Sequence, residues 1–223
     1  MKSVIIGAGT YGEVYLSYLQ ESGAEIFGFI DDNEALWGRE VRGIPVLGGI
    51  DKLGKLGTTQ GVEAVYCPLG NNRLRVSILK FAESLGYQIP NYIHPAACVS
   101  QNVQIGKGVY ILLDTNVMPY TVIQDYVMIS MGANIAHHSL LEEGVFISTG
   151  VNFGASIKAH KFAYVGIGAT IMTGVHDLGE NCLVGAGSIV IRDIPTNAVC
   201  CGNPAKVIRI KADNEESAPV GGG

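Results

Sequence analysis

The chain has 223 residues, of which 48% are hydrophobic and 16% are charged. A chain of this length and composition can bury the core of one large domain or two modest ones, which argues against a disordered protein. The formal net charge of -5 argues against an extended nucleic-acid-binding surface, because displacing counterions from phosphates requires clustered Lys and Arg.

The first residues, Met1–Gly7, resemble a strand that runs into a glycine turn rather than a signal peptide. No stretch approaches the roughly 18 consecutive apolar residues that span a bilayer. The cysteines are odd in number and lack the paired spacing of metal ligands, so we interpret them as small buried hydrophobes in a reducing compartment. They are Cys67, Cys98, Cys182, Cys200 and Cys201. The sequence therefore predicts a cytoplasmic protein without membrane, nucleic-acid or metal binding.

Residues 1–90 alternate between strand-like and helix-like patterns. Apolar runs predict strands at Ser3–Ile6, Glu25–Ile30 and Ala64–Leu69, and helical patterns lie between them at Tyr11–Glu21 and after them from about Arg73 to Leu85. This order is typical of βαβ units in a small parallel sheet covered by helices. We predict a Rossmann-like α/β domain over residues 1–90.

From Ile93 onward the pattern has a period of six residues. Bulky hydrophobes recur at Ile93, Val99, Ile105, Ile111, Val117, Ile123, Ile129, Ile135, Leu141, Ile147, Phe153, Val165 and Ile171, with Ala159 as the one small member. Four residues after each comes a small or β-branched residue, from Ala97 to Val175. The register slips by one residue near Asp177 and resumes at Leu178.

A six-residue period fits neither a helix nor a sheet of long strands, and it is the signature of a β-solenoid with short flat faces. Strands of a sandwich would drift in register over such a length. We expect the bulky column to fill the interior and the second column to let the chain turn. The solenoid is predicted over residues 91–212, and the polar, Gly-rich residues 213–223 are predicted to be disordered.

Gly7-x-Gly9-x-x-Gly12 lies between a predicted strand and a predicted helix, and Asp31 and Asp32 end the next strand. This is the context of a dinucleotide-binding fingerprint. Taken alone, the motif favours NAD or NADP, and a purely structural turn is the alternative.

Together with the repeats, several segments resemble one family. They are Gly7–Gly12, Gly28–Asp32, Gly43–Gly48, Ile93–Pro95 and Gly202–Lys206. The chain resembles the hexapeptide-repeat acyltransferases, and more closely the sugar O-/N-acyltransferases of the sialic-acid O-acetyltransferase and bacillosamine-pathway type. The resemblance implies a left-handed parallel β-helix, an exception to the right-handed crossover rule. It also implies acetyl-CoA as co-substrate and a homotrimer with active sites at subunit interfaces.

The resemblance changes the interpretation of the glycine motif from a dinucleotide to a nucleotide sugar. The helix N-terminus would then face the diphosphate, and the acids at the strand end would face the ribose or base. The implied nucleotide-sugar residues are Gly7, Gly9, Thr10, Tyr11, Gly12, Asp31 and Asp32.

His137 and His138 follow a bulky residue of the repeat, so we expect them at a corner of the solenoid, with at least one exposed. The resemblance places the catalytic base at His137, and a neutral imidazole can take a proton from an attacking amine. The next residue is commonly acidic in relatives but is His138 here, and a second family histidine falls on Phe146. Surface histidines without a role are the alternative. The histidine spacing does not reproduce the zinc site of γ-class carbonic anhydrases.

Small residues on successive coils would let the pantetheine arm of the cofactor lie against the backbone, although they also suit plain coil geometry. By resemblance, the turn at Gly202–Lys206 lies near the adenine and phosphates, and it would also serve as a cap on the open solenoid end. The implied acetyl-CoA residues are Gly150, Gly168, Ala169, Gly187, Gly202, Asn203, Pro204 and Lys206.

The predicted function is acetyl-CoA-dependent N-acetylation of a nucleotide-linked amino sugar, a 4-amino-4,6-dideoxy hexose in bacterial surface-glycan biosynthesis. Transfer would be direct, with a histidine general base. The alternatives are sugar O-acetylation of the sialic-acid type, a non-enzymatic sugar-nucleotide sensor, and an oxidoreductase or metal-dependent hydratase.

Overall fold

The computed structural model describes residues 1–212, so the predicted disordered segment 213–223 lies outside the described residues. The chain divides into two compact units. The first comprises Met1–Gly70 and Leu74–Pro90, and the second comprises Asn71–Arg73 and the chain from Asn91 onward. Within the described part, no helix is long and apolar enough to cross a membrane.

A three-stranded parallel sheet organises the first unit, in the order β2-β1-β5. Its strands are β1 (Lys2–Ile6), β2 (Glu25–Ile30) and β5 (Ala64–Tyr66), and its long helices are α1 (Thr10–Glu21) and α3 (Asn72–Ser84). The side chains of Val4 and Ile5 on the central strand are completely buried. These elements agree with the predicted βαβ order, and β5 ends earlier than the apolar run suggests.

Helix α1 buries one face, formed by Gly12, Tyr15, Leu16 and Leu19, at the spacing of an amphipathic helix. A Cβ on Gly12 would lie 2.0 Å from the carbonyl oxygen of Gly7. The last glycine of the motif therefore allows the helix to approach the turn that follows β1.

The segment between β2 and β5 contains elements that the sequence analysis does not predict. They are the short 3-10 helices η1 (Glu34–Leu36) and η2 (Ile50–Lys52), the hairpin of β3 (Glu40–Val41) and β4 (Ile44–Pro45), and helix α2 (Leu53–Gln60). α2 contains two glycines and two threonines, which weaken its helical signal, and only Leu53 and Leu56 are buried.

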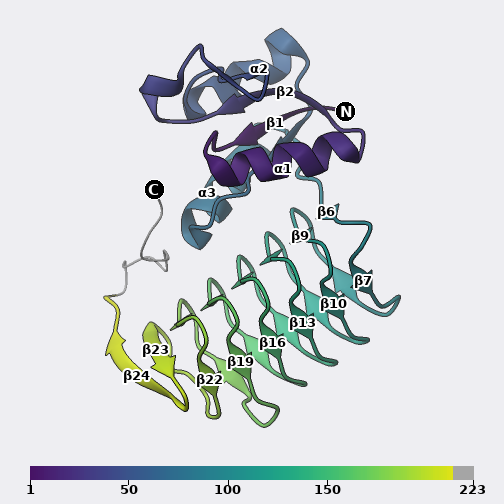
Figure 1. The fold of residues 1–223 in the computed structure, drawn as a ribbon. Coiled ribbons are helices and arrows are strands. Elements are labelled where there is room, and N and C mark those ends of the chain that lie inside the picture. The colour runs from purple at the N-terminus through teal and green to yellow at the C-terminus, as the bar shows by residue number, and fades with distance from the viewer. Residues whose placement is uncertain (213–223) are drawn as a thin grey trace. The chain divides into compact units, whose positions relative to one another are not determined.

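The second unit is a parallel β-solenoid with three sheets, and Figure 1 shows the strands of one sheet stacked in succession. We name each sheet by a central strand. The β10 sheet contains β7 (Cys98–Val99), β10 (Asn116–Val117), β13 (Asn134–Ile135), β16 (Asn152–Phe153), β19 (Thr170–Ile171) and β22 (Ile189–Val190). The β11 sheet contains β8 (Gln104–Ile105), β11 (Val122–Ile123), β14 (Leu140–Leu141), β17 (Lys158–Ala159) and β20 (Asp177–Leu178).

The β12 sheet contains β6 (Tyr92–Ile93), β9 (Tyr110–Ile111), β12 (Met128–Ile129), β15 (Phe146–Ile147), β18 (Tyr164–Val165), β21 (Leu183–Val184), β23 (Ala198–Gly202) and β24 (Ala205–Ile210). Each solenoid strand from β6 to β22 has two residues, of which the second belongs to the bulky column. The predicted left-handed parallel β-helix with an N-terminal α/β domain is confirmed.

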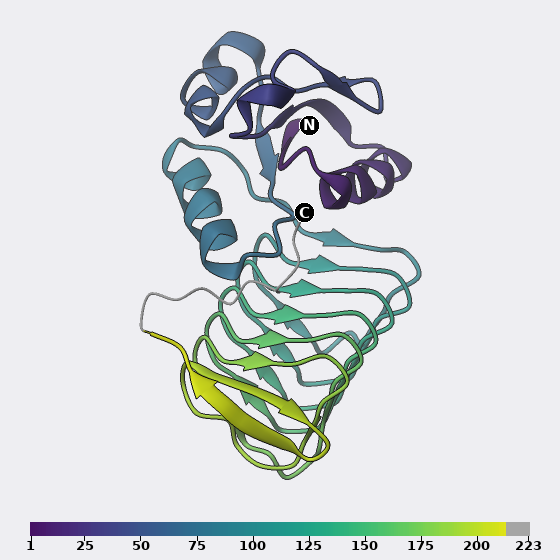
Figure 2. The same ribbon diagram turned by 60° about the vertical axis from the view of Figure 1, so that its left-hand side comes forward.

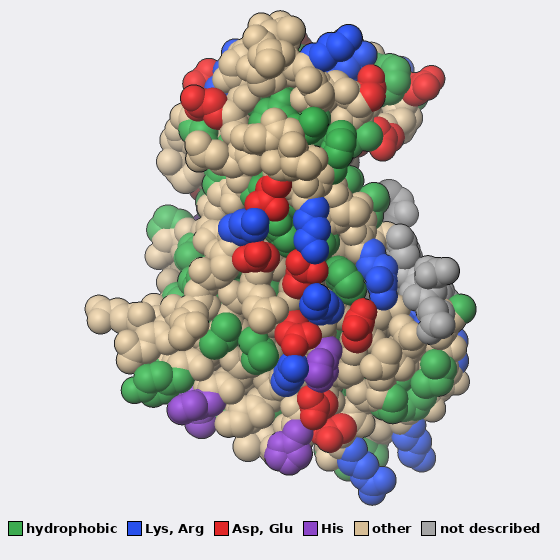
Figure 3. Space-filling view, turned by 180° about the vertical axis from the view of Figure 1, so that it is seen from behind, with side chains coloured by type: hydrophobic (Ala, Val, Ile, Leu, Met, Phe, Trp, Pro, Cys, Tyr) green, Lys and Arg blue, Asp and Glu red, His purple; other side chains and the backbone are tan. Residues whose placement is uncertain are grey.

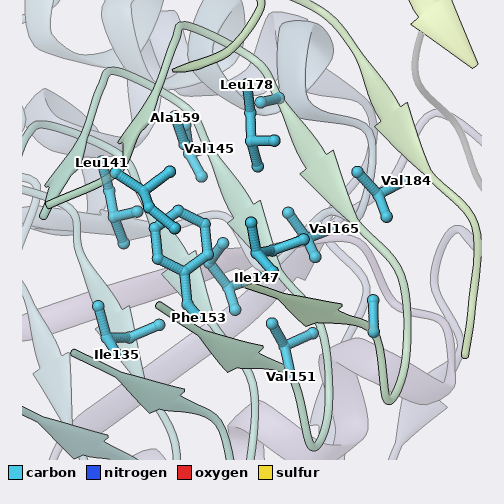
Figure 4. Packing of buried hydrophobic residues seen from close by; sticks show 14 of the residues in the cluster. Ile135, Leu141, Val145, Ile147, Val151, Phe153, Ala159, Val165, Leu178 and Val184 are labelled. Atoms are coloured by element: carbon cyan, nitrogen blue, oxygen red, sulfur yellow. The ribbon is translucent and has the colours of Figure 1, made fainter. Parts of the chain in front are cut away.

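The bulky column fills the solenoid interior, and Figure 4 shows Ile135, Ile147 and Phe153 converging within it. These three side chains, from two of the sheets, are at most 2% exposed. Stacked coils thus bury one continuous core, since no coil can cover its own apolar side chains.

The second column has a different role from the expected one. Its members are also buried in the core, Val127 and Ala169 among them. From Val109 onward, the chain instead turns at the residue immediately before each of them, which has a left-handed backbone, as at Tyr120, His138 and Gly150.

The register slip lies just before Asp177, where Gly174 has a φ of 105° and Thr173 pairs with Val175. At the C-terminal end of the solenoid, β23 pairs with β21 in parallel and with β24 in antiparallel orientation. Figure 2 shows this hairpin in yellow, lying over the last coil. The hairpin therefore covers the open end, which agrees with the cap alternative for Gly202–Lys206.

Candidate active site

Two hydrogen bonds hold the glycine turn after β1, one to the last residue of β2 and one to Asp31, which follows β2. The Gly7 N–H donates to Ile30 O at 2.8 Å, and the Ala8 N–H donates to Asp31 Oδ2 at 2.8 Å. The other carboxylate oxygen of Asp31 accepts from the Asn33 N–H, also at 2.8 Å. Asp31 thus fixes two loops, so its role here is to shape the site.

Asp32 lies beside a hollow of about 180 Å³ at the carboxyl edge of the sheet, together with Gly7, Ile50 and Leu69. One oxygen of its carboxylate, Oδ1, accepts from the Ile50 N–H at 2.9 Å. The carboxyl edge of parallel strands is where open α/β sheets bind ligands. Asp31 also lines the hollow, but both of its carboxylate oxygens already accept backbone N–H groups, so Asp32 is the better placed of the two to bind a further group.

Helix α1 begins with Gly9 as its N-cap, and no side chain caps it. Thr10, Tyr11 and Gly12 form the first turn, and the backbone N–H groups of a first turn point towards the N-terminal end of the helix. A Cβ on Gly9 would meet no protein atom within 4 Å. The space over this end of α1 is open, as a diphosphate site requires.

The solenoid places His137 and His138 at the corner between β13 and β14, where both side chains are exposed. His138 has a left-handed backbone with a φ of 57°. The two Nδ1 atoms are 3.0 Å apart, and the rings are perpendicular with centroids separated by 5.1 Å. One Nδ1 must donate and the other accept, so the pair shares a single proton between these atoms.

Neighbouring coils fix this corner. The His138 N–H donates to Pro119 O at 3.3 Å, and the Ser156 N–H donates to His137 O at 2.9 Å. The Tyr120 ring, at the equivalent corner of the preceding coil, lies 4.9 Å from the His138 ring. The buried Thr121 hydroxyl donates to Ala136 O at 3.2 Å. These contacts hold the backbone of the histidine pair from both sides.

Three of the glycines implicated in cofactor binding stack along another corner, between the β12 and β10 sheets. Gly150, Gly168 and Gly187 each have a left-handed φ of 66° to 68°, and a Cβ on any of them would meet nothing within 4 Å. The Gly168 N–H donates to Thr149 O and the Gly187 N–H to Ile167 O, so successive coils align there. We call this strip the glycine edge.

The hairpin of β23 and β24 turns beside the glycine edge, because the Gly202 N–H donates to the Ser188 hydroxyl at 3.1 Å. Asn203, Pro204 and Lys206 are exposed on this turn. Ala169 differs from the expectation. It is fully buried in the solenoid core, so its side chain cannot reach a cofactor, and only its backbone is left for such a contact.

A row of charged side chains crosses the β11 sheet, and Figure 3 shows acidic, basic and histidine side chains gathered on one face. Lys158 Nζ lies 2.9 Å from Glu142 Oε1, and His160 Nε2 lies 2.8 Å from Asp177 Oδ1. Within residues 1–212, no group of three or more His, Cys, Asp or Glu is arranged to hold a metal ion.

His94, Phe146 and two of the cysteines make contacts that support the fold. His94 Nδ1 accepts from the Ala96 N–H at 3.0 Å and so caps its own turn. Phe146 stacks on Tyr164 with ring centroids 5.0 Å apart. Burial raises the pKa of the thiols of Cys67 and Cys182 to about 12, which makes both unreactive near neutral pH.

A ladder of asparagines, not predicted from the sequence, lies on the exposed face of the β10 sheet. Asn116 Nδ2 donates to Asn134 Oδ1, and Asn134 Nδ2 donates to Asn152 Oδ1, both at 3.0 Å. The ladder borders a groove of about 360 Å³ that also contains Ala136 and Met172. The recurrence of Asn every 18 residues, at 116, 134 and 152, could have indicated this ladder from the sequence.

Comparisons with known proteins agree with this geometry. The family model of the PglD N-terminal domain matches residues 2–81. PerB from Caulobacter crescentus, crystallised with CoA and GDP-perosamine, is 31% identical, with a TM-score of 0.85 over 93% of this chain and 97% of that one. The chain belongs to the hexapeptide-repeat sugar acyltransferase family.

Two further relatives support the assignment to this acyltransferase family. The acetyltransferase domain of PglB from Neisseria gonorrhoeae is 29% identical, with a TM-score of 0.84 over 93% of this chain and 99% of that one. Galactoside O-acetyltransferase from Escherichia coli is 32% identical over 117 residues, which are 52% of this chain and 57% of that protein. The chain spans 23% to 57% of the length of three curated relatives that it matches. The predicted family and enzyme class, a sugar acyltransferase, are confirmed.

Proposed function

We propose that this sugar acyltransferase transfers the acetyl group of acetyl-CoA to the amine of a nucleotide-linked amino sugar. The observation that supports it most is the full-length similarity to PerB, whose structure was determined with CoA and GDP-perosamine. The PglB domain was also determined with acetyl coenzyme A. We further propose a 4-amino-4,6-dideoxy hexose as the sugar, a role in bacterial surface-glycan biosynthesis, and a cytoplasmic location.

In this proposal the first unit, residues 1–90, binds the nucleotide part of the substrate. The open N-terminus of α1 at Gly9, Thr10 and Tyr11 faces the diphosphate, since its N–H groups and helix dipole favour negative charge. Asp32 faces the ribose from the hollow at the sheet edge. Asp31 supports the loop by accepting the Ala8 N–H.

The solenoid, residues 91–212, supplies the base. If His137 Nδ1 donates to His138 Nδ1 across their 3.0 Å contact, His137 Nε2 carries the free lone pair. The sugar nitrogen attacks the thioester carbonyl carbon, and Nε2 takes its proton as the C–N bond forms. Collapse of the tetrahedral oxyanion breaks the C–S bond, and the CoA thiolate leaves and is protonated. A backbone N–H stabilises the oxyanion.

Acetyl-CoA lies along the glycine edge, where Gly150, Gly168 and Gly187 allow an extended chain to approach the backbone. Lys206 on the adjoining hairpin is the charge partner for the cofactor phosphates. Met131 and Ile167 flank this edge and are 41% and 59% exposed.

The glycine edge and the histidine corner lie on opposite borders of the β10 sheet within one chain. A thioester on the glycine edge is therefore approached by the histidine corner of another copy. We propose a homotrimer in which each active site combines these two borders from adjacent subunits.

Turnover tests the proposed activity directly. The purified chain is incubated with acetyl-CoA and UDP-, GDP- or dTDP-linked amino sugars, and the release of thiol is followed with a chromogenic reagent. We expect thiol release with at least one amino sugar and none with its deaminated analogue. Release with the analogue would favour sugar O-acetylation, and binding of the sugars without release would favour a sensor.

A further inference from the structure

Trp37 is the only tryptophan of the chain, and it lies in the loop that follows β2. One hydrogen bond holds its side chain, and another holds its backbone. The indole Nε1–H donates to Asp31 O at 2.7 Å, and its backbone N–H donates to Glu34 O at 3.2 Å. The residue nevertheless stays 40% exposed. The ring is thus both fixed and accessible.

The indole approaches the wall of the hollow that contains Asp32. An ideal Cβ on Gly49 would lie 2.8 Å from Asp32 Oδ1 and 3.4 Å from Trp37 Cζ2. Both groups therefore converge on the same glycine, next to Ile50 in the wall of the hollow. Only a glycine leaves room for the carboxylate and the ring to meet there.

The order of groups along this sheet edge is the order of groups in a nucleotide. The open N-terminus of α1 suits phosphate, Asp32 suits a ribose hydroxyl, and the Trp37 ring lies near the same glycine, Gly49, that Asp32 faces. An aromatic ring accepts the face of any base by stacking, and a ring already fixed by a hydrogen bond loses little entropy on binding.

We propose that Trp37 is the stacking platform for the nucleobase of the nucleotide substrate. This inference rests on the proposed nucleotide-sugar function and adds a residue to its binding site. Trp37 contributes to affinity for nucleosides of any base, and it does not contribute to contacts with phosphate.

The single tryptophan makes the test direct. Tryptophan fluorescence is followed while the wild-type chain is titrated with UDP, GDP and dTDP, and calorimetry gives the Kd. We expect saturable quenching with the same Kd as calorimetry. The Trp37→Leu variant is expected to bind the nucleotides roughly 5- to 100-fold more weakly, because the stacking is lost. Circular dichroism verifies that the variant is folded.

Two controls separate stacking from support of the loop. Trp37→Phe removes the hydrogen bond to Asp31 O but keeps an aromatic face, so it is expected to retain most of the affinity. Inorganic pyrophosphate is expected to bind wild type and Trp37→Leu equally. If the Phe and Leu variants lose the same affinity, or pyrophosphate binding falls as well, the stacking role is wrong.

A different result would show that the proposed nucleotide-sugar function itself is wrong. If calorimetry detects no nucleotide binding to wild type, the nucleotide-sugar function fails, and the role of Trp37 fails with it. If nucleotides bind wild type and Trp37→Leu alike without quenching, only the role of Trp37 is overturned.

Discussion

The histidine pair shows how a single residue departs from the pattern that the family resemblance implies. Where relatives commonly have an acid after the base, this chain has His138, and its Nδ1 lies 3.0 Å from that of His137. A neutral imidazole can fix the tautomer of its neighbour as a carboxylate does, but without a full negative charge to stabilise an imidazolium. His138 also packs on Tyr120, which fixes its ring.

Removing His137 tests the general base. A positioned base is typically worth 10²–10⁴-fold, so His137→Ala is expected to lower kcat by about that factor with little change in acetyl-CoA affinity. Steady-state kinetics of the variant and the wild type measure kcat, and titration with acetyl-CoA measures the affinity.

His138→Ala is the matched control, and it is expected to cost less than His137→Ala because His138 acts only through its neighbour. An inactive His138→Ala together with a mild His137→Ala would assign the base to His138. Two fully active variants would exclude a histidine base.

At the scale of elements, the turn between β1 and α1 contains two glycines with different reasons to be glycine. Gly12 lies where a Cβ would collide with the carbonyl oxygen of Gly7, whereas a Cβ on Gly9 would meet no protein atom. Gly12 therefore allows the helix to pack against the turn, whereas Gly9 leaves space over the helix N-terminus.

These two glycines give a matched pair of variants. Gly9→Ala is expected to leave the unfolding temperature nearly unchanged and to raise the KM for the nucleotide sugar, because the methyl group enters the proposed diphosphate site. Gly12→Ala is expected to destabilise the first unit. Thermal unfolding and steady-state kinetics measure both. If Gly9→Ala raises the KM values of acetyl-CoA and sugar equally, the proposed division of labour between the units is wrong.

The charged row on the β11 sheet makes stability depend on pH. Burial alone would raise the pKa of Glu142, but the Lys158 ammonium and the Lys161 N–H lower the pKa below its ordinary value of 4.5. A carboxyl group with a lowered folded-state pKa stabilises the fold above its unfolded pKa, and this contribution is lost as the pH falls through the folded value.

Glu142→Gln is therefore expected to lower the free energy of unfolding at pH 7 by up to about 1 kcal/mol. The difference from wild type should shrink towards zero near pH 3 (about one unit below the ordinary carboxyl pKa). Urea unfolding at the two pH values measures it, with the exposed Glu25→Gln as control. An equal deficit at both pH values would mean that Glu142 acts through packing.

At the scale of the whole molecule, the three features of the proposed site lie on separate parts of the chain. The nucleotide hollow is in the first unit, and the glycine edge and the histidine corner border opposite sides of the β10 sheet in the second. The proposed homotrimer would bring the glycine edge of one subunit to the histidine corner of its neighbour without any rearrangement of the solenoid.

Light scattering tests the assembly. At micromolar concentration we expect about three times the chain mass of 23.6 kDa. Mixing His137→Ala with a Gly168→Trp variant, whose glycine edge is blocked, is expected to restore part of the activity. In mixed trimers, some interfaces combine the intact glycine edge of the first variant with the intact His137 of the second. A monomer with full activity would overturn the shared site.

The repeat, the glycine fingerprint and the alternation of the first ninety residues were sufficient to predict the two folds, because side-chain periodicity fixes which residues face a core. Contacts between coils could not be predicted this way. The stacking of Gly150 on Gly168 and Gly187, and of His138 on Tyr120, depends on left-handed corners that repeat once per coil. Likewise, only the folded loop shows that both aspartates line the hollow, and that both oxygens of Asp31 accept backbone N–H groups whereas Asp32 accepts one through Oδ1. The sequence alone determined which residue types are available, and tertiary packing decided which of them meet, since those contacts join residues far apart along the chain.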